Sequence, residues 1–168
     1  MDFVRGLGDG GDALDLGCGD GRLTAELRAR SVAGADVSRV ALERAERRLP
    51  GARFVLVEPD EPLPFDDGSF DLVLCAETLE HVRDVQLLLS EARRVLRPGG
   101  RLAVTTPAHS RLTAFRLAAR GWESEFDPLS PHLRFLSKRS LRTLLDAMGF
   151  ELDSLERRGG TLFATAGR

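Results

Sequence analysis

The chain has 168 residues, of which 42% are hydrophobic and 30% are charged, and its formal net charge is −2. This length suits a single domain with one core spanning residues 1–168, and the apolar share is too high for a disordered chain. The charge argues against binding nucleic acid over the whole surface, and no apolar run approaches the roughly 20 residues of a membrane-spanning helix.

Strands and helices alternate along the first two thirds of the chain. In chain order we expect a strand at 13–16, a glycine-rich turn at 17–21, a helix at 22–30, a strand at 31–36, a helix from Ser38 to Arg48, a strand at 53–57, a loop at 58–69, a strand at 70–76, a helix that Asp84 caps and Pro98-Gly99-Gly100 ends, and a strand at 101–106. The i, i+4 spacing of Leu23 and Leu27 predicts the first helix. The continuous apolar run at 70–76 is typical of a strand covered on both faces.

The last third of the chain differs from this alternation. Residues 107–136 form an irregular, lid-like insert with a short helix expected at 111–120. A helix follows at 137–148, and two apolar runs at 150–156 and 161–166 predict a hairpin. Strand–crossover units followed by a hairpin indicate an α/β fold whose sheet is mostly parallel, with helices on both faces.

The turn Gly17-Cys18-Gly19-Asp20-Gly21 follows the first strand directly. Glycines there permit a tight turn and let a ligand approach the backbone closely. A dinucleotide-binding turn, as in nicotinamide-linked oxidoreductases, would read Gly-x-Gly-x-x-Gly, but here the third glycine comes one residue early. The acids Asp15 and Asp20 would repel a pyrophosphate and attract a ligand that carries an ammonium and a sulfonium.

Further segments follow this turn in a fixed order. They are Ala35-Asp36-Val37-Ser38, Leu63-Pro64-Phe65, Phe70-Asp71, Leu79-Glu80-His81-Val82, Val95-Leu96-Arg97-Pro98-Gly99-Gly100 and Met148-Gly149-Phe150. With the turn, they resemble class I S-adenosylmethionine-dependent methyltransferases, of the small-molecule type similar to methyltransferase 11/23-like domains. The resemblance implies a doubly wound, Rossmann-like sheet of seven strands in the order 3-2-1-4-5-7-6, with strand 7 antiparallel. It also implies S-adenosylmethionine as the cofactor and methyl transfer as the reaction.

The same resemblance implies which residues bind the cofactor. Asp36 would bond the ribose hydroxyls, and we expect the ligand to be its main partner, so that its loss costs little fold stability. The family usually has an acid against the adenine where this chain has Pro59, so either Glu58 or Asp60 would take that role. The full expected set is Asp15, Gly17, Cys18, Gly19, Gly21, Asp36, Val37, Glu58, Asp60, Cys75 and Ala76.

The histidines are the candidates for a general base, because imidazole titrates near neutrality. His81 and His109 follow the fourth and fifth strands on the side where parallel sheets bind ligands, so we expect them as catalytic residues, with capping or packing as the alternative. We expect His132, in the insert, to be a structural or substrate-binding residue. No metal site is predicted, because three scattered histidines without clustered carboxylates are a poor donor set.

The segment after the fourth strand, Cys75-Ala76-Glu77-Thr78, bears on the acceptor. It lacks the Asn/Asp-Pro-Pro-Tyr/Phe motif of the nucleic-acid and protein amino-methyltransferases that share this fold. We therefore expect a small-molecule acceptor, anionic or lipid-like, that reacts through an O, N or C nucleophile, and no nucleic-acid partner. The alternative is a non-catalytic module with the same fold that acts as a cofactor-binding or regulatory protein.

Two features of the sequence bear on the cellular compartment in which the protein works. The N-terminus has no basic segment followed by an apolar one, so it does not resemble a secretory signal. The two cysteines are too few for a disulfide framework. We therefore expect a reduced, cytoplasmic setting.

Overall fold

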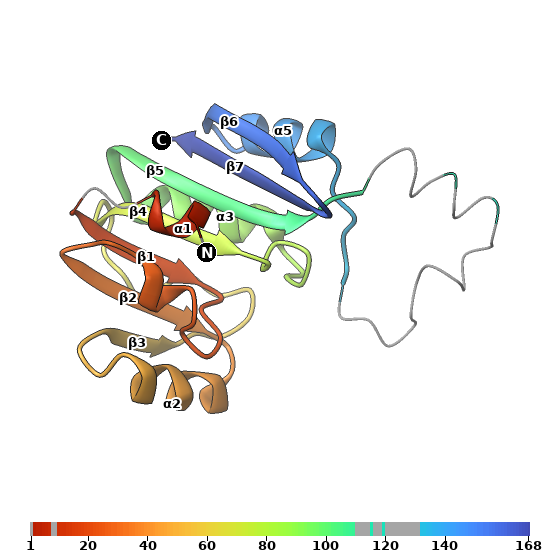
Figure 1. Cartoon of the computed structure of the whole chain (residues 1–168). Helices are drawn as coiled ribbons and strands as arrows, with labels where there is room; N and C mark the ends of the chain where they lie inside the picture. Colours follow the sequence, from red (N-terminus) through yellow and green to blue (C-terminus); the bar gives the residue numbers. More distant parts are fainter. Residues whose placement is uncertain (1, 8–9, 110–114, 116–118, 120–131) are drawn as a thin grey trace.

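The computed structural model of the chain describes residues 2–7, 10–109, 115, 119 and 132–168. Its main elements are α1 (Asp2–Arg5), β1 (Asp12–Leu16), the 3₁₀ helix η1 (Thr24–Glu26), β2 (Ser31–Asp36), α2 (Arg39–Arg48), β3 (Arg53–Leu56), β4 (Phe70–Ala76), α3 (Val85–Val95), β5 (Leu96–Pro107), α5 (Lys138–Ala147), β6 (Glu151–Arg158) and β7 (Thr161–Gly167). These strands form one sheet in the order β3-β2-β1-β4-β5-β7-β6 (Figure 1). In this described sheet β7 runs antiparallel to both of its neighbours, β5 and β6, and the other pairs of strands are parallel, so the predicted topology is confirmed.

Two apolar clusters cover the two faces of the sheet. On one face, α3 and α5 pack onto the strands, and Leu89 of α3 is fully buried there. On the other face, Val4 of α1 and Leu27 join the second cluster. Along β4, Val73 belongs to the first cluster and Leu74 to the second. This alternation explains why β4 is a continuous apolar run, since both of its faces are covered.

The helix predicted over 22–30 is wrong in extent, because only the three residues of η1 are helical. Leu27 leaves η1 in an extended conformation with ψ of 126°. The Arg30 N–H then donates to the Gly11 carbonyl at 2.8 Å, and the Arg30 guanidinium pairs with Asp12. These contacts hold the segment at the start of β1, so the chain enters β2 before a full helix can form.

Side-chain caps fix the starts of the longer helices. The Ser38 hydroxyl accepts from the Ala41 N–H at 3.3 Å, and the Asp84 carboxylate accepts from the Leu87 N–H at 2.9 Å. Ser137 and Ser140 form a capping box at the start of α5. Each cap supplies an acceptor to an N–H that has no partner within the helix, so the predicted starts are correct.

The predicted insert at about 107–136, with its helix at 111–120, lies mostly outside the described residues. Its two described ends meet, because the His109 N–H donates to the Leu136 carbonyl at 2.8 Å. Among the described helices, none combines the length and the apolar character needed to span a membrane.

Candidate functional site

A crevice of about 500 Å³ opens where β1, β2, β3 and β4 end. The strand order reverses between β1 and β4, and open α/β sheets bind ligands at the carboxyl ends of the strands beside such a reversal. A larger hollow of about 850 Å³ lies at the amino ends of the strands, near Asp12, Ser31 and Arg53. We take the crevice as the candidate site, because the ligand-binding loops of this architecture leave the carboxyl ends.

Glycine is needed at the three positions of the turn for different structural reasons. All three have positive φ, at +73° for Gly17, +53° for Gly19 and +77° for Gly21. A Cβ on Gly17 would lie 2.4 Å from the Thr78 hydroxyl oxygen, and a Cβ on Gly21 would lie 3.0 Å from the Ala45 Cβ of α2. A Cβ on Gly19 would meet no atom within 4 Å. Gly17 and Gly21 therefore allow close packing, whereas Gly19 faces open space that a ligand can enter.

Asp36 ties the glycine turn to the end of β2. Its carboxylate accepts from the Gly19 N–H and from the Ser38 N–H, each at 2.8 Å, and it lines the crevice. The expectation that a ligand is its main partner is therefore revised, because two backbone donors already hold it. Val37 beside it also lines the crevice and is 58% exposed, which offers an apolar surface next to the carboxylate.

Asp15 of β1 and Asp20 of the turn, the two acids expected beside the ligand, differ in environment. Asp15 is buried and accepts from the Thr24 hydroxyl at 2.7 Å, outside the lining of the crevice. Burial raises the pKa of its carboxyl to about 6, and the neighbouring Asp36 carboxylate adds to the shift. Asp20 instead pairs with Arg22 and Arg48, each at 3.0 Å, so its charge is already compensated.

Both cysteines are buried beside the ends of the strands. Burial raises the pKa of the Cys18 thiol far above its usual range and that of the Cys75 thiol to about 12. Both are therefore neutral thiols near pH 7 and not nucleophiles. Neither Cys75 nor Ala76, the last two residues of β4, contributes to the lining of the crevice.

The segment after β3 forms one wall of the crevice with Glu58, Pro59 and Asp60. Asp60 has a positive φ of 59°, and its carboxylate pairs with Arg83 at 2.6 Å. Among the described residues, Glu58 takes part in no ion pair. Glu61 of the same segment also lines the crevice without an ion pair among the described residues, so Glu58 and Glu61, unlike Asp60, have carboxylates that a ligand can engage.

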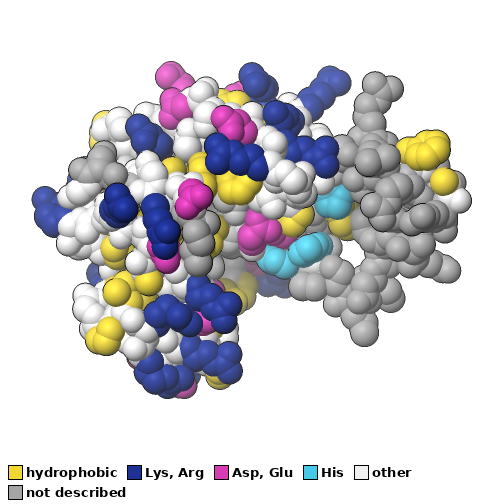
Figure 2. Space-filling model, viewed as in Figure 1, with side chains coloured by type: hydrophobic (Ala, Val, Ile, Leu, Met, Phe, Trp, Pro, Cys, Tyr) yellow, Lys and Arg dark blue, Asp and Glu magenta, His cyan; other side chains and the backbone are white. Residues whose placement is uncertain are grey.

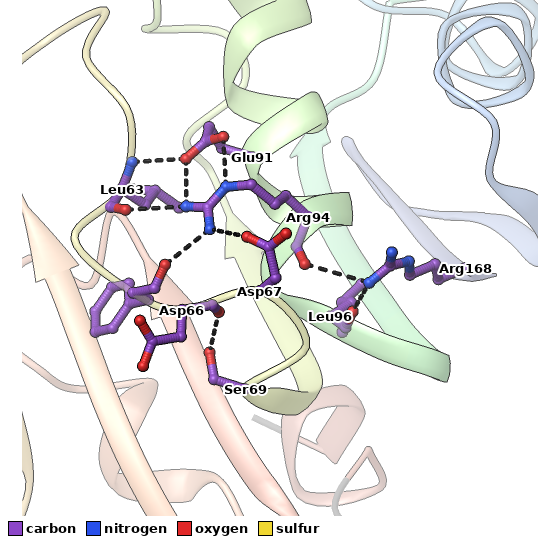
Figure 3. A network of polar contacts seen from close by, with 9 residues as sticks. Leu63, Asp66, Asp67, Ser69, Glu91, Arg94, Leu96 and Arg168 are labelled. Atoms are coloured by element: carbon purple, nitrogen blue, oxygen red, sulfur yellow. Dashed lines mark hydrogen bonds and ion pairs between the residues drawn. The ribbon is translucent and has the colours of Figure 1, made fainter.

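Arg94 of α3 holds the loop that follows this wall (Figure 3). Its guanidinium donates to the carbonyls of Leu63 at 3.0 Å and Phe65 at 2.8 Å, and it pairs with Asp67 at 2.6 Å. Glu91 completes the network, because it pairs with Arg94 at 2.7 Å and accepts from the Leu63 N–H at 2.7 Å. The network fixes the path of the loop between β3 and β4, and with it the wall of the crevice.

We expect Arg94→Met to lower the free energy of unfolding by about 2 kcal/mol, because two carbonyls and Glu91 lose their donor. Urea unfolding measures the change. Arg101→Met is the matched control, because Arg101 is exposed and its nitrogen lies 3.9 Å from Asp153. The control should change stability by less than about 0.5 kcal/mol. Equal effects of the two substitutions would contradict the assigned role of the network.

The two histidines predicted to be catalytic lie in different surroundings. His81 lines the crevice, and its ring centroid lies 4.8 Å from that of His132. His109 lies outside the lining, and its ring packs edge-on against Phe135 at 4.7 Å. Burial lowers the pKa of His109. The structure therefore brings His81, and not His109, to the crevice.

Two glutamates near this crevice, Glu77 and Glu80, occur in the segments compared above but are not among the expected site residues. Glu77 lines the crevice with a positive φ of 50°, and it accepts from the Thr105 hydroxyl at 2.9 Å. Burial raises the pKa of its carboxyl, and the Glu80 carboxylate adds to the shift. Positive φ is costly for a residue with a side chain, and such strain is common at functional sites. No sequence signal marks this strain, although Glu77 stands where related enzymes carry a motif.

Comparison with known proteins places the sequence in a family. A family profile described as a methyltransferase domain matches residues 14–104. A probable S-adenosylmethionine-dependent methyltransferase of Mycolicibacterium smegmatis is 35% identical over 147 residues, which cover 86% of this chain and 53% of that protein. A 2-phytyl-1,4-naphtoquinone methyltransferase of Nostoc punctiforme is 37% identical over 120 residues, which cover 64% of this chain and 52% of that protein. The chain thus spans about half the length of these curated relatives.

A comparison with solved structures also finds methyltransferases. The solved structure of an S-adenosylmethionine-dependent methyltransferase from Methanosarcina mazei matches this chain with a TM-score of 0.76 and 25% identity. The match covers 100% of this chain and 97% of that one. The similarity in fold therefore extends beyond residues 14–104, which the family profile matches.

Proposed function

Because this chain belongs to the class I S-adenosylmethionine-dependent methyltransferase family, we propose that it transfers a methyl group from S-adenosylmethionine to a small-molecule acceptor. The observation that carries the proposal is the crevice itself, which is lined by Gly17 and Asp36 at the carboxyl ends of β1 and β2 and by Glu58 after β3. When bound, S-adenosylmethionine supplies a methyl group on a positively charged sulfur. The task of the chain is then to hold and orient the two reactants and to stabilise the developing charge.

The groups around the crevice fit this cofactor in their chemistry. In our proposal Asp36 binds the ribose hydroxyls, Val37 contacts the adenine ring, and Glu58 accepts from the adenine amine. Glu58 is preferred to Asp60 because Arg83 already engages the Asp60 carboxylate. A crevice with this many carboxylates suits a ligand with positive charge better than a pyrophosphate.

For the acceptor we propose a small molecule of lipid-like or anionic character. The relative from Nostoc punctiforme is named for 2-phytyl-1,4-naphtoquinone, which supports lipid-like acceptors as the first class to test. If the acceptor is a hydroxyl, His81 is the first candidate for the general base, because it lines the crevice. A non-catalytic module remains the alternative function, and transfer of a labelled methyl group to any member of an acceptor panel would exclude it.

S-adenosylhomocysteine at 1 mM (about tenfold or more above the Kd we expect) should raise the Tm by several °C, because a ligand that binds only the folded state adds to its stability. Differential scanning fluorimetry measures the shift, and NADH at the same concentration is the control. A shift with NADH and none with S-adenosylhomocysteine would contradict the proposed cofactor and favour an oxidoreductase.

A further inference from the structure

A cluster of carboxylate and imidazole groups lies beside the crevice. Glu80, His81 and His132 each present one ligand atom, and these atoms all lie within 4.8 Å of one another. Figure 2 shows cyan His side chains next to magenta acidic side chains, on the side of the sheet toward which β4 and β5 point in Figure 1. The sequence alone does not reveal this group, because His132 lies near the end of the insert, far along the chain from Glu80 and His81.

One oxygen in this cluster has no hydrogen-bond partner. Glu80 is only 1% exposed, and its Oε2 accepts from the Thr106 hydroxyl at 3.0 Å. Its other oxygen, Oε1, is buried without a hydrogen bond among the described residues. His81 Nε2 lies 3.9 Å from this oxygen, which is too long for a hydrogen bond. A buried acceptor of this kind is costly and indicates a missing partner such as an ion or a water.

The backbone holds the three side chains together from separate parts of the chain. The Leu133 N–H donates to the Glu80 carbonyl at 2.7 Å, directly beside His132. The Arg134 guanidinium donates to the carbonyls of Val82 and Arg83. The segment that carries His132 is therefore bonded to the segment that carries Glu80 and His81, and the cluster is part of the folded framework.

We propose that Glu80, His81 and His132 bind a divalent first-row transition-metal ion such as Zn²⁺ or Co²⁺. Two imidazoles and one carboxylate are the donors that such ions prefer, and three protein ligands leave a position open. In a tetrahedral site, ligand atoms about 2.0–2.2 Å from the ion lie about 3.3–3.6 Å from one another, so closing the site around an ion requires side-chain movements of about 1 Å. The ion would give Oε1 of Glu80 its partner and would lie at the crevice wall that His81 forms. This inference does not depend on the proposed methyl transfer, and a His81 whose Nε2 binds the ion would not serve as the general base.

The test uses the full chain, freed of metal with a chelator and titrated with Co²⁺ while its visible absorption is recorded. We expect one ion per chain, with the strong absorption of a four- or five-coordinate site, and a Tm that rises by about 3 °C or more on addition of Zn²⁺. Mg²⁺ should bind far more weakly, because it prefers oxygen ligands. No binding of Co²⁺ or Zn²⁺ would overturn the proposal and leave a bound water as the partner of Glu80. Equal binding of Mg²⁺ would overturn the assignment to transition metals.

Variants locate the ion. Glu80→Gln and His132→Ala should each weaken Co²⁺ binding by at least about 100-fold, because each removes one of three ligands. His109→Ala is the matched control, since His109 belongs to no group of ligand atoms found among the described residues, and its Co²⁺ affinity should be unchanged. If Glu80→Gln fails to fold, His132→Ala decides, because His132 is only partly buried. Retained binding in His132→Ala, or lost binding in His109→Ala, would contradict the assigned ligands.

Discussion

Replacing Asp36 with alanine is expected to weaken the binding of S-adenosylhomocysteine by at least about 100-fold. A hydrogen bond to a charged group contributes roughly 1.5–3 kcal/mol, and each 1.4 kcal/mol changes the dissociation constant about tenfold, so two such bonds account for the loss. The N–H groups of Gly19 and Ser38 already hold the carboxylate at 2.8 Å each, which orients it before a ligand arrives. Isothermal titration calorimetry measures the affinity.

The same substitution also leaves two backbone N–H groups without an acceptor, so we expect the free energy of unfolding to fall by about 1–3 kcal/mol. Calorimetry is therefore done well below the Tm measured for the variant. Asp20→Ala is the matched control from the same turn, because Arg22 and Arg48 already pair with Asp20. Its affinity should stay within about twofold of the unsubstituted chain. Equal losses in both variants would show that the general negative charge of the turn, and not Asp36, holds the ligand.

Local signals predict most of the fold. The caps Ser38, Asp84 and Ser137 mark the starts of α2, α3 and α5, because capping depends only on residues within one turn of the helix. The residues of β7 alternate in burial, whereas β4 is a continuous apolar run. Each pattern reflects which faces of the strand are covered, so it can be recognised from the sequence of that strand. The sheet order followed from the family resemblance.

Contacts between distant segments explain what the sequence alone misses. The helix predicted at 22–30 is cut short by the bond from Arg30 to the Gly11 carbonyl, which no local pattern indicates. The spacing of the glycines predicts a ligand turn but cannot show that Gly21 packs against Ala45. The grouping of Glu80 with His132 likewise depends on the bond between their two segments, formed only in the folded chain.

Asp15 is expected to make stability depend on pH in the weakly acidic range by up to about 3 kcal/mol. Burial raises the pKa of this carboxyl to about 6, against about 3.9 in an unfolded chain. Between these values the folded state keeps a proton that the unfolded state releases. The stabilisation from this group is therefore complete below about pH 4 and is lost as the pH rises through 6.

Urea unfolding of the unsubstituted chain and of Asp15→Asn at pH 4 and pH 7.5 measures this effect. Asparagine retains an oxygen that can accept from the Thr24 hydroxyl but does not titrate. The unsubstituted chain should lose up to about 3 kcal/mol relative to the variant between the two pH values, while the other titrating groups cancel in the comparison. A constant difference at the two pH values would contradict the raised pKa.

The ligand provides a second test of the same carboxylate. A nearby cation lowers the pKa of a carboxyl, so saturating S-adenosylmethionine, which carries both an ammonium and a sulfonium, should shrink the pH dependence that Asp15 causes. S-adenosylhomocysteine carries only the ammonium and should shrink it less. If neither ligand changes the pH dependence of stability, the Asp15 carboxylate interacts with Thr24 in the fold and not with the cofactor. A larger effect of S-adenosylmethionine would instead mean that the buried acid stabilises the sulfonium across the turn, which is the electrostatic role that the acidic turn implies.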